Sequence, residues 1–549
     1  MKHPQPLRPI MLAGTGSDVG KSVLATALCR IFKQDGYHPA PFKAQNMALN
    51  SYATPEGFEI GRAQAVQAEA AGIPCHTDMN PLLLKPSSDQ TSQVVLHGKP
   101  IGNTHAYDYF RREGREELRA EVHGAFDRLS SRFNPIVMEG AGSISELNLK
   151  DSDLVNMPMA RHAHAAVLLV ADIDRGGVFA SVYGSIMLQS PEDRRLIKGV
   201  IINKFRGDLA LFTEGRKLLE GLTGVPVLGV VPYFQDITIE EEDSVALTSK
   251  NRTSQVGKVN IAVVRTGHIS NFTDFSTLEH DPRIHLYYTN NLKELEKADI
   301  IILPGSKNTL GDLAELKNNG VAQCLVRVYR KGTTLVGICG GYQMMGQMLH
   351  DPDNLEGSGY QHLPGLGLLP TETTITQEKV TRQVEFTHFG DPTLCRGYEI
   401  HMGQTTLLKG ASCSPTNQFS DGTSEGTRLS ERCWGTYIHG ILDNPAVVDR
   451  LLAPFSHKLT QEKALDYASY KEEQYDKLAD HVRQYVDVER IYQIMQDYDS
   501  SSLQRGSYPL QLQQQCTHYH RPHGIVSVPL GAVAPHHLLS RALPSQPRG

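Results

Sequence analysis

The stretch PIMLAGTGSDVGKSVLATALCRIFKQ, residues 9–34, decides how the chain begins to fold. PIMLAG (9–14) is a short apolar run that predicts a buried strand, and KSVLATALCRIFKQ (21–34) has apolar residues at helical spacing. A polar segment rich in glycine joins them. The stretch therefore predicts a strand–loop–helix unit, the usual opening of an α/β domain.

Short apolar runs ending in Gly, Asp, Asn or Pro recur along residues 1–245, with helical stretches between them, and they predict a parallel sheet with crossover helices. These runs are IVMEG (136–140), HAAVLLVAD (164–172), KGVIINK (198–204) and PVLGVVP (226–232). A second alternating unit contains VNIAVVR (259–265), ADIIILPG (298–305) and TTLVGIC (333–339). The fold class is thus α/β, with two doubly wound, mostly parallel-sheet domains.

The predicted organisation has five parts. A first domain at 1–245 precedes a polar linker at 246–258 and a second domain at 259–455. Residues 456–498 are charged and compatible with helix, and residues 499–549, rich in Gln, His and Pro, predict a disordered tail.

Composition excludes several classes of protein. The 549 residues are 40% hydrophobic and 21% charged, with a net charge of −6, which gives no electrostatic case for binding nucleic acid or an anionic membrane. Eight scattered cysteines without a CxxC pair favour a reducing, cytoplasmic compartment. No run of 18 apolar residues and no signal peptide is found in the sequence, so we expect no membrane span.

The loop of the opening stretch resembles a phosphate-binding loop. GTGSDVGKS varies the pattern G-x-x-x-x-G-K-[ST], because five residues rather than four separate Gly14 from Gly20. Between a strand and a helix, its backbone N–H groups and the helix dipole would face one concavity. Lys21 would reach the β- and γ-phosphates and Ser22 would bind Mg²⁺. The alternative is an ordinary glycine-rich turn. The candidate nucleotide-binding residues of this loop are Gly16, Ser17, Asp18, Val19, Gly20, Lys21 and Ser22.

Further polar residues follow strands of the first domain, where open α/β sheets bind ligands. Glu139 could hold Mg²⁺ beside the phosphates, or be a solvated loop residue. Asp172 and Asp174 could bind metal or substrate, or cap the next helix. The remaining candidates are Asn203 and Lys204, which resemble an NKxD-type contact to a purine base, and Lys43, which is placed to meet a phosphate or a carboxylate unless it is simply solvated.

A second chemistry is predicted around Cys339. Gly337-Ile338-Cys339-Gly340-Gly341 is a G-x-C-x-G version of the nucleophile elbow, which turns sharply from strand to helix and exposes the nucleophile. The helix start would stabilise the thiolate. The N–H of Gly340, with Gly305 from ILPGSKNT (302–309), would bind an oxyanion. The alternative is a small buried cysteine that fills a turn.

The base for this thiol should be a histidine. His439 in TYIHGILD (436–443) and His401 in GYEIHMG (397–403) are both candidates, and the residues alone favour neither.

These motifs together resemble known families. GICGGYQMMG with TYIHG is similar to the class I glutamine amidotransferase domain, and Ile441, two residues after the histidine where an acid is usual, resembles its cobyric/cobyrinic acid synthase branch. GTGSDVGKS with VMEGAG resembles dethiobiotin-synthetase-like ATP-binding domains. The order of the domains, with FKAQNMALNSY, ADIDRGG and INKFRGD, resembles the cobyric acid synthase family over about residues 8–490.

The resemblance implies a P-loop-like first domain, a flavodoxin-like glutaminase domain, and ATP-dependent amidation of the b, d, e and g carboxylates of adenosylcobyrinic acid a,c-diamide, a step of cobalamin biosynthesis. Cys339 would be the nucleophile, His439 the base in preference to His401, and Glu139 the Mg²⁺ ligand. The substrates would be glutamine, ATP and a corrinoid, with Mg²⁺ and no tightly held cofactor. With Ile441 in place of an acid, the group that orients His439 is unassigned.

Alternatives within the class are a cobyrinic acid a,c-diamide synthase and an amidotransferase acting on a cell-wall lipid intermediate. From other classes, a P-loop ATPase switch would leave Cys339 and His439 without a role, and a regulator without activity would have no need of Lys21, Ser22, Cys339 and His439.

Overall fold

The computed structural model describes residues 5–86, 91–105, 115–234, 236–240, 250–459 and 462–497. The predicted tail at 499–549 and the first four residues of the predicted linker lie outside the described residues. Residues 250–258 contain no helix or strand.

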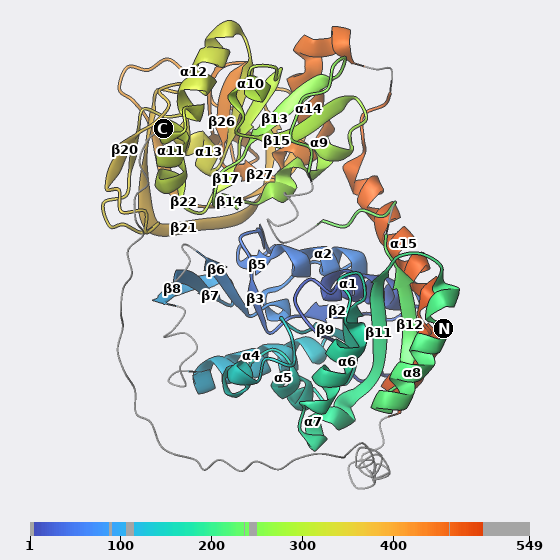
Figure 1. Cartoon of the computed structure of the whole chain (residues 1–549). Helices are drawn as coiled ribbons and strands as arrows, with labels where there is room; N and C mark the ends of the chain where they lie inside the picture. The colour runs from blue at the N-terminus through green and yellow to red at the C-terminus, as the bar shows by residue number, and fades with distance from the viewer. Residues whose placement is uncertain are drawn as a thin grey trace, which may run out of the picture. The chain divides into compact units, whose positions relative to one another are not determined.

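The first sheet has six parallel strands in the order β12-β11-β10-β1-β9-β2. The first strand of the chain, β1, lies between β9 and β10, so the loop after it opens at the middle of the sheet. Figure 1 labels α1, the helix that follows this loop, and the strands β2, β9, β11 and β12 of the same sheet. The strands are β1 Ile10–Gly14, β2 Ala40–Phe42, β9 Ile136–Glu139, β10 Ala166–Asp172, β11 Ile197–Phe205 and β12 Val227–Pro232. The helices are α1 Lys21–Gln34, α2 Arg62–Ala71, α4 Arg115–Ser130, α5 Met157–His162, α6 Val178–Met187, α7 Pro191–Leu196 and α8 Thr213–Thr223.

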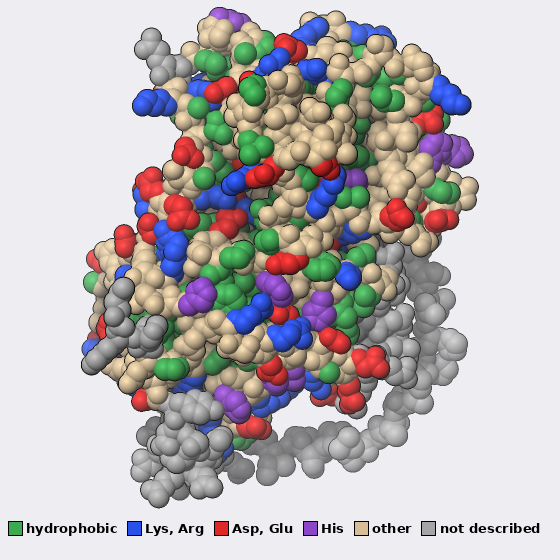
Figure 2. Space-filling view, turned by 180° about the vertical axis from the view of Figure 1, so that it is seen from behind, with side chains coloured by type: hydrophobic (Ala, Val, Ile, Leu, Met, Phe, Trp, Pro, Cys, Tyr) green, Lys and Arg blue, Asp and Glu red, His purple; other side chains and the backbone are tan. Residues whose placement is uncertain are grey.

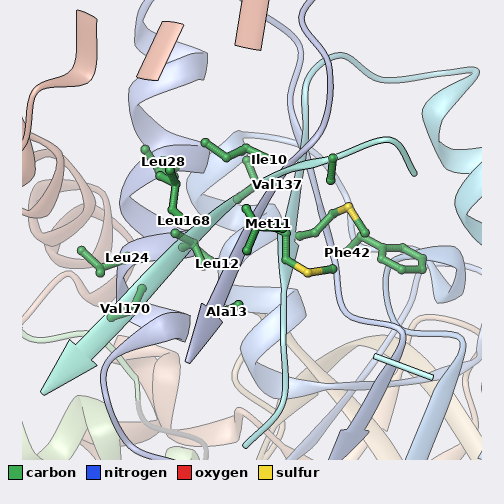
Figure 3. Packing of buried hydrophobic residues seen from close by; sticks show 14 of the residues in the cluster. Ile10, Met11, Leu12, Ala13, Leu24, Leu28, Phe42, Val137, Leu168 and Val170 are labelled. Carbon is green, nitrogen blue, oxygen red and sulfur yellow. The ribbon is translucent and has the colours of Figure 1, made fainter. Parts of the chain in front are cut away.

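The centre of this domain is a closely packed apolar layer. Ile10, Leu12 and Leu168 of the central strands are fully buried, and Leu24 and Leu28 of α1 lie over them (Figure 3). Burying side chains on both faces explains why these strands read as continuous apolar runs in the sequence.

Two small antiparallel additions extend the first domain. One is a sheet of β3 Gln45–Met47, β6 Leu82–Pro86, β7 Thr91–Leu96 and β8 Lys99–His105, in which only β3 and β6 pair in parallel. The other is the hairpin of β4 Ser51–Ala53 and β5 Glu59–Gly61.

The second domain has a sheet in the order β15-β13-β16-β18-β26-β25. The first five strands are parallel, and their order is the flavodoxin-like 2-1-3-4-5. The strands are β13 Val259–Val264, β15 Ile284–Thr289, β16 Ile300–Leu303, β18 Thr334–Ile338, β25 Thr427–Ser430 and β26 Cys433–Thr436. The helices are α9 Ser276–His280, α10 Leu292–Leu295, α11 Thr309–Asn318, α12 Val321–Lys331, α13 Gly340–Met344 and α14 Pro445–Leu452. Both predicted doubly wound domains are thereby confirmed.

A further, mostly antiparallel sheet of seven strands belongs to the second domain. Its centre is the long ribbon of β21 Thr371–His388 and β22 Cys395–Leu407. The other strands are β19 Met348–His350, β20 His362–Pro364, β23 Asn417–Phe419, β24 Ser424–Glu425 and β27 Ile438–His439. Two short strands, β14 Ile269–Ser270 and β17 Gly305–Ser306, pair separately.

The helical C-terminal segment consists of α15 Tyr467–Tyr485 and α16 Val488–Gln496. Its apolar side chains, among them Leu478, Val482 and Ile491, join the core of the first domain. Arg30 of α1 also bonds Asp476 at 2.7 Å.

The described surface carries both signs of charge. On the face shown in Figure 2, Lys and Arg side chains are interspersed with Asp and Glu. Among the described helices, none has the length and apolar character needed to cross a bilayer.

Candidate active sites

Cys339 stands at a strained turn between β18 and α13. Its backbone has φ 50° and ψ −110°, a conformation that is unfavourable for a residue with a Cβ and that recurs at nucleophile elbows. The two glycines that follow are required by space. A methyl group on Gly341 would come within 2.0 Å of the Leu303 carbonyl oxygen, and one on Gly340 within 2.8 Å of the Ser306 nitrogen.

His439 lies on β27 with its ring fully buried, and it bonds a residue that sequence reasoning missed. Its Nδ1 is 2.7 Å from Oδ2 of Asp274, and the other carboxylate oxygen of Asp274 accepts the N–H of Gly440 at 2.9 Å. Asp274 is itself only 2% exposed. The carboxylate therefore fixes both the ring and the start of the following turn, and it leaves Nε2 for the thiol.

The electrostatics of this pair favour a protonated ring. Burial alone would lower the pKa of His439, but the charge and hydrogen bond of Asp274 and the contact with Cys339 outweigh it and raise the pKa to about 10. A cationic imidazole beside a thiol stabilises the thiolate, the form that acts as a nucleophile. The arrangement can thus activate Cys339 for attack on a carbonyl carbon.

Cys339 and His439 line one pocket, together with Gly340, Lys307, Lys85 and Ser51. The last two belong to the first domain. Gly305 is adjacent, because a carbon added to it would lie 3.4 Å from Cε1 of His439. The structure thus brings together the four predicted residues Cys339, His439, Gly305 and Gly340.

His401 lines the same pocket but has other partners. Its Nδ1 bonds the Gly403 carbonyl oxygen at 2.9 Å, its Nε2 lies 3.7 Å from Glu399, and its ring stacks on Tyr437 with centroids 3.8 Å apart. The carboxylate of Glu399 thus lies farther from the His401 ring than the carboxylate of Asp274 lies from the His439 ring.

In the first domain, Lys21 holds the loop between β1 and α1 closed. Its Nζ donates to the Gly16 carbonyl oxygen at 2.9 Å and to the Gly142 carbonyl oxygen at 3.1 Å. Burial lowers the pKa of Lys21 to about 8, against the opposing charge of Glu139. Gly20 has φ 97°, which a residue with a Cβ rarely adopts. The loop Gly16–Ser22 is therefore held by Lys21 both to its own backbone and to the segment that follows β9.

Glu139 is the centre of a buried polar cluster at the end of β9. Its carboxylate accepts from Ser22 Oγ at 2.8 Å, from Lys43 Nζ at 2.8 Å and from Gln67 Nε2 at 2.8 Å. Burial would raise the pKa of Glu139, but the charge of Lys43 and the three hydrogen bonds keep it below its usual value.

The predicted metal pair, Ser22 and Glu139, lies within hydrogen-bond distance and so fits a Mg²⁺ ion that takes one hydroxyl and one carboxylate from the protein and the rest from phosphates and water. Two neighbouring acceptors support this fit. Gln67 Oε1 and Asn203 Oδ1 are buried and accept no hydrogen bond from the described residues. Buried acceptors of this kind usually have a partner.

Asn203 and Lys204 hold the loop from the side. Asn203 Nδ2 donates to the Val19 carbonyl oxygen at 2.9 Å, and Lys204 Nζ donates to the Asp18 carbonyl oxygen and lies 3.1 Å from Asp172 Oδ2. Asp172 also accepts the N–H of Asp174 at 2.8 Å. Both carboxylates thus have protein partners, since Asp174 accepts from Arg206 as well.

Comparison with known proteins agrees with this architecture. The family model for the CobQ/CobB/MinD/ParA nucleotide-binding domain matches residues 10–245, and the one for the CobB/CobQ-like glutamine amidotransferase domain matches residues 260–447. Cobyric acid synthases of Bacteroides fragilis and Phocaeicola vulgatus are 69% and 66% identical over 493 residues, which is 90% of this chain and 99% of each relative. The cobyric acid synthase of Syntrophobacter fumaroxidans is 49% identical over 509 residues, 89% of this chain and 98% of the relative.

The fold and the two matched domains define a glutamine amidotransferase joined to a nucleotide-binding domain, a class of enzyme that forms carbon–nitrogen bonds. Within that class, the chain belongs to the cobyric acid synthase family.

Proposed function

We propose that this chain uses ATP and glutamine to amidate the b, d, e and g carboxylates of adenosylcobyrinic acid a,c-diamide, giving adenosylcobyric acid. Membership of the family supports the reaction. The observation that carries the proposal is the buried contact of His439 with Asp274 beside Cys339, in a chain that also has a phosphate loop.

The proposed glutaminase half-reaction uses three side chains. The Cys339 thiolate attacks the side-chain amide carbon of glutamine, and His439 gives its proton to the departing nitrogen, so the C–N bond breaks and ammonia leaves. A thioester remains on Cys339. Water hydrolyses it, with His439 taking the proton, and glutamate is released. Asp274 keeps the ring oriented and stabilises its positive charge, as the acid does in other triads.

We propose that the backbone N–H of Gly340 and the loop at Gly305 bind the oxyanion that forms on the glutamine carbonyl oxygen. Gly305 supports this role because it lies beside the His439 ring. Donors fixed where negative charge develops are among the largest contributions to catalysis.

In the first domain, the loop Gly16–Ser22 would bind the ATP phosphates through its backbone N–H groups and Lys21. Asn203 and Lys204 would hold this loop next to the purine base of ATP. Ser22 and Glu139 would hold Mg²⁺, which when bound neutralises phosphate charge during activation of the acceptor carboxylate. Lys43, Asp172 and Asp174 remain proposed acceptor-side residues, although each has a protein partner in this structure.

The test uses Cys339→Ala in the full chain. We expect glutamine-dependent amidation and glutamate release to fall on the order of 10³-fold or more, because the nucleophile is gone. Amidation with ammonium chloride as nitrogen source should be retained, because the first domain is unchanged. Glutamate release that survives this substitution would end the proposal.

The matched control is Cys324→Ala, which removes another buried cysteine of the same domain. It should leave both nitrogen sources usable. The mass of the product separates the alternatives: four successive acid-to-amide exchanges on the a,c-diamide support this function, whereas two exchanges on cobyrinic acid and none on the diamide would assign the a,c-diamide synthase activity instead.

A further inference from the structure

One short segment of the second domain connects two parts of the glutaminase site. Its first residues form β14, which pairs with β17 so that Ser270 lies opposite Gly305. Its last residues form a 3₁₀ turn, Phe272–Phe275, that carries Asp274. Between them stands Asn271, which is buried and has φ 52° and ψ 42°. We call residues 269–275 the connecting segment.

The first domain holds the connecting segment through a reciprocal pair of hydrogen bonds. The Asn50 side-chain oxygen accepts the N–H of Phe272 at 3.2 Å, and the Asn271 side-chain oxygen accepts the N–H of Ser51 at 3.1 Å. These residues are all less than 7% exposed. Each domain thus supplies one backbone donor and one amide acceptor across the contact.

The same contact reaches the catalytic histidine. Asn271 Nδ2 donates to the hydroxyl of Tyr398 at 3.4 Å, and the Tyr398 ring stacks on the His439 ring with centroids 5.4 Å apart. Asn271 therefore directly follows β14, which pairs with the strand of Gly305, and precedes the 3₁₀ turn that carries Asp274. Its side chain also contacts Tyr398, whose ring faces His439.

The first domain also contacts the loop that begins at Gly305, which is proposed to bind the oxyanion. Lys307, two residues after Gly305, donates from Nζ to the side-chain oxygen of Gln93 on β7 at 3.0 Å. Its own N–H donates to the His268 carbonyl oxygen, next to the connecting segment. Two separate contacts thus hold the same pair of neighbouring loops.

We propose that Asn271 and Asn50 form an interdomain clamp that positions the catalytic groups of the glutaminase site, so that glutamine hydrolysis depends on contact with the nucleotide-binding domain. If the clamp opened, the N–H groups of Ser51 and Phe272 would lose their acceptors, and a buried donor without a partner is costly. The contact with the first domain therefore favours this conformation of the connecting segment. Asn271 and Asn50 act as positioning residues, because neither is assigned a step in the reaction. The inference rests on the proposed function of Cys339 and His439.

The test is Asn271→Gly in the full chain. Glycine adopts a positive φ without strain, so the substitution removes the clamp side chain and leaves the backbone conformation accessible. We expect kcat/KM for glutamine hydrolysis to fall about tenfold, which corresponds to about 1.4 kcal/mol of transition-state stabilisation. Ammonia-dependent amidation should change less than about twofold.

Asn50→Ala tests the other half of the clamp from the first domain. It should reproduce the selective loss of glutamine hydrolysis, and agreement between the two variants would exclude an effect peculiar to residue 271. Thermal unfolding of each variant checks that the chain is folded.

Gln383→Ala is the matched control. Gln383 Nε2 also bonds the first domain, at the Ala53 carbonyl oxygen, 3.0 Å away, and among the described residues no side-chain hydrogen bond joins it to the connecting segment. It should leave glutamine hydrolysis unchanged. Equal losses with glutamine and ammonia in Asn271→Gly, or no loss with either, would overturn the clamp. If the unmodified chain showed no ammonia-dependent amidation, that result would instead count against the proposed function.

Discussion

At the scale of single residues, the glutaminase site depends on where one proton resides. The pKa of His439, raised to about 10, keeps the imidazole charged at neutral pH, and a charged ring favours the thiolate of Cys339. Asp274 is the main source of this shift because it contributes both a charge and a short hydrogen bond. The nucleophile is thus prepared by a residue that does not touch it.

Asp274→Asn tests this division of roles. The neutral amide should lower the pKa of His439 toward its ordinary value of about 6.5. Glutamine hydrolysis should fall on the order of 10³-fold, as in other triads that lose the acid. Alkylation of the peptide containing Cys339 at neutral pH, followed by mass spectrometry, should be slower in this variant than in the unmodified chain.

The same substitution has a consequence for stability. Because the folded-state pKa of His439 is raised, its contribution is fully present below about pH 6.5 and is lost as pH rises through about 10. Asp274→Asn should remove most of this alkaline loss. Asp449→Asn, at an exposed ion pair with Arg283, is the control and should keep the original profile. An unchanged rate of Cys339 alkylation in Asp274→Asn would contradict the assignment.

Asp274 shows why some site residues could not be predicted from the sequence. Cys339 and its glycines form a local motif, because the turn itself needs them. Asp274 lies 165 residues before His439, in NFTDFS, which matches no spacing rule. The absence of an acid at Ile441 indicated that a partner was missing, but only the fold shows which residue supplies it.

At the scale of elements, strands buried on both faces were predictable and the β21–β22 ribbon was not. β13 is buried at every position, so its sequence is a continuous apolar run. β21, with the sequence TETTITQEKVTRQVEFTH, has many exposed or half-exposed residues. Its polar composition is typical of a loop. Its pairing with β22 depends on contacts between residues that are far apart in the sequence.

Helix α15 is the second element whose role comes from tertiary packing. From its sequence it is a charged helix, but its apolar face is buried in the core of the first domain. Leu478→Ala should therefore lower the free energy of unfolding by about 2–5 kcal/mol, the usual range for a buried leucine. Denaturant unfolding, monitored through the ATP-dependent activity with ammonia, would measure the decrease in the free energy of unfolding of the first domain.

Leu218→Ala on α8 is a matched control, because that leucine is 55% exposed. Its effect should stay within about 0.5 kcal/mol. Equal effects of the two substitutions would show that α15 does not contribute to the core.

At the scale of the whole described chain, a buried ion cluster joins the two domains. Glu59 on β5 accepts from Lys85 Nζ at 2.6 Å and from Lys379 of β21, and it is only 1% exposed. Burial would raise the pKa of Glu59, but the two lysines hold it well below its usual range. The charge of one carboxylate thus keeps two buried cations together.

Glu59→Gln should destabilise the chain by about 3–5 kcal/mol at pH 7, because two buried lysines lose their counter-ion. The sign of the pH effect follows from the lowered pKa. The contribution of Glu59 is present above about pH 4.5 and is lost as pH falls toward the folded-state value. Thermal unfolding from about pH 5 down to about pH 3 should therefore show a smaller acid loss in Glu59→Gln than in the unmodified chain.

Glu385→Gln, at the exposed pair with Arg396, is the control and should change stability by less than about 1 kcal/mol. If Glu59→Gln were as stable as this control, the ion cluster would not contribute to the docking of the two domains.

The position of α16 has a consequence for how the protein is made. Arg8 donates its N–H to the Met495 carbonyl oxygen at 3.1 Å, so the beginning and the end of the described chain meet in one core. In topological terms the amidotransferase domain is an insertion within the nucleotide-binding domain. During translation, all strands of the inserted domain are synthesised before α15. The nucleotide-binding domain therefore lacks α15 and α16 until the inserted domain has been made. The core of the first domain is therefore complete only after the whole inserted domain has been synthesised.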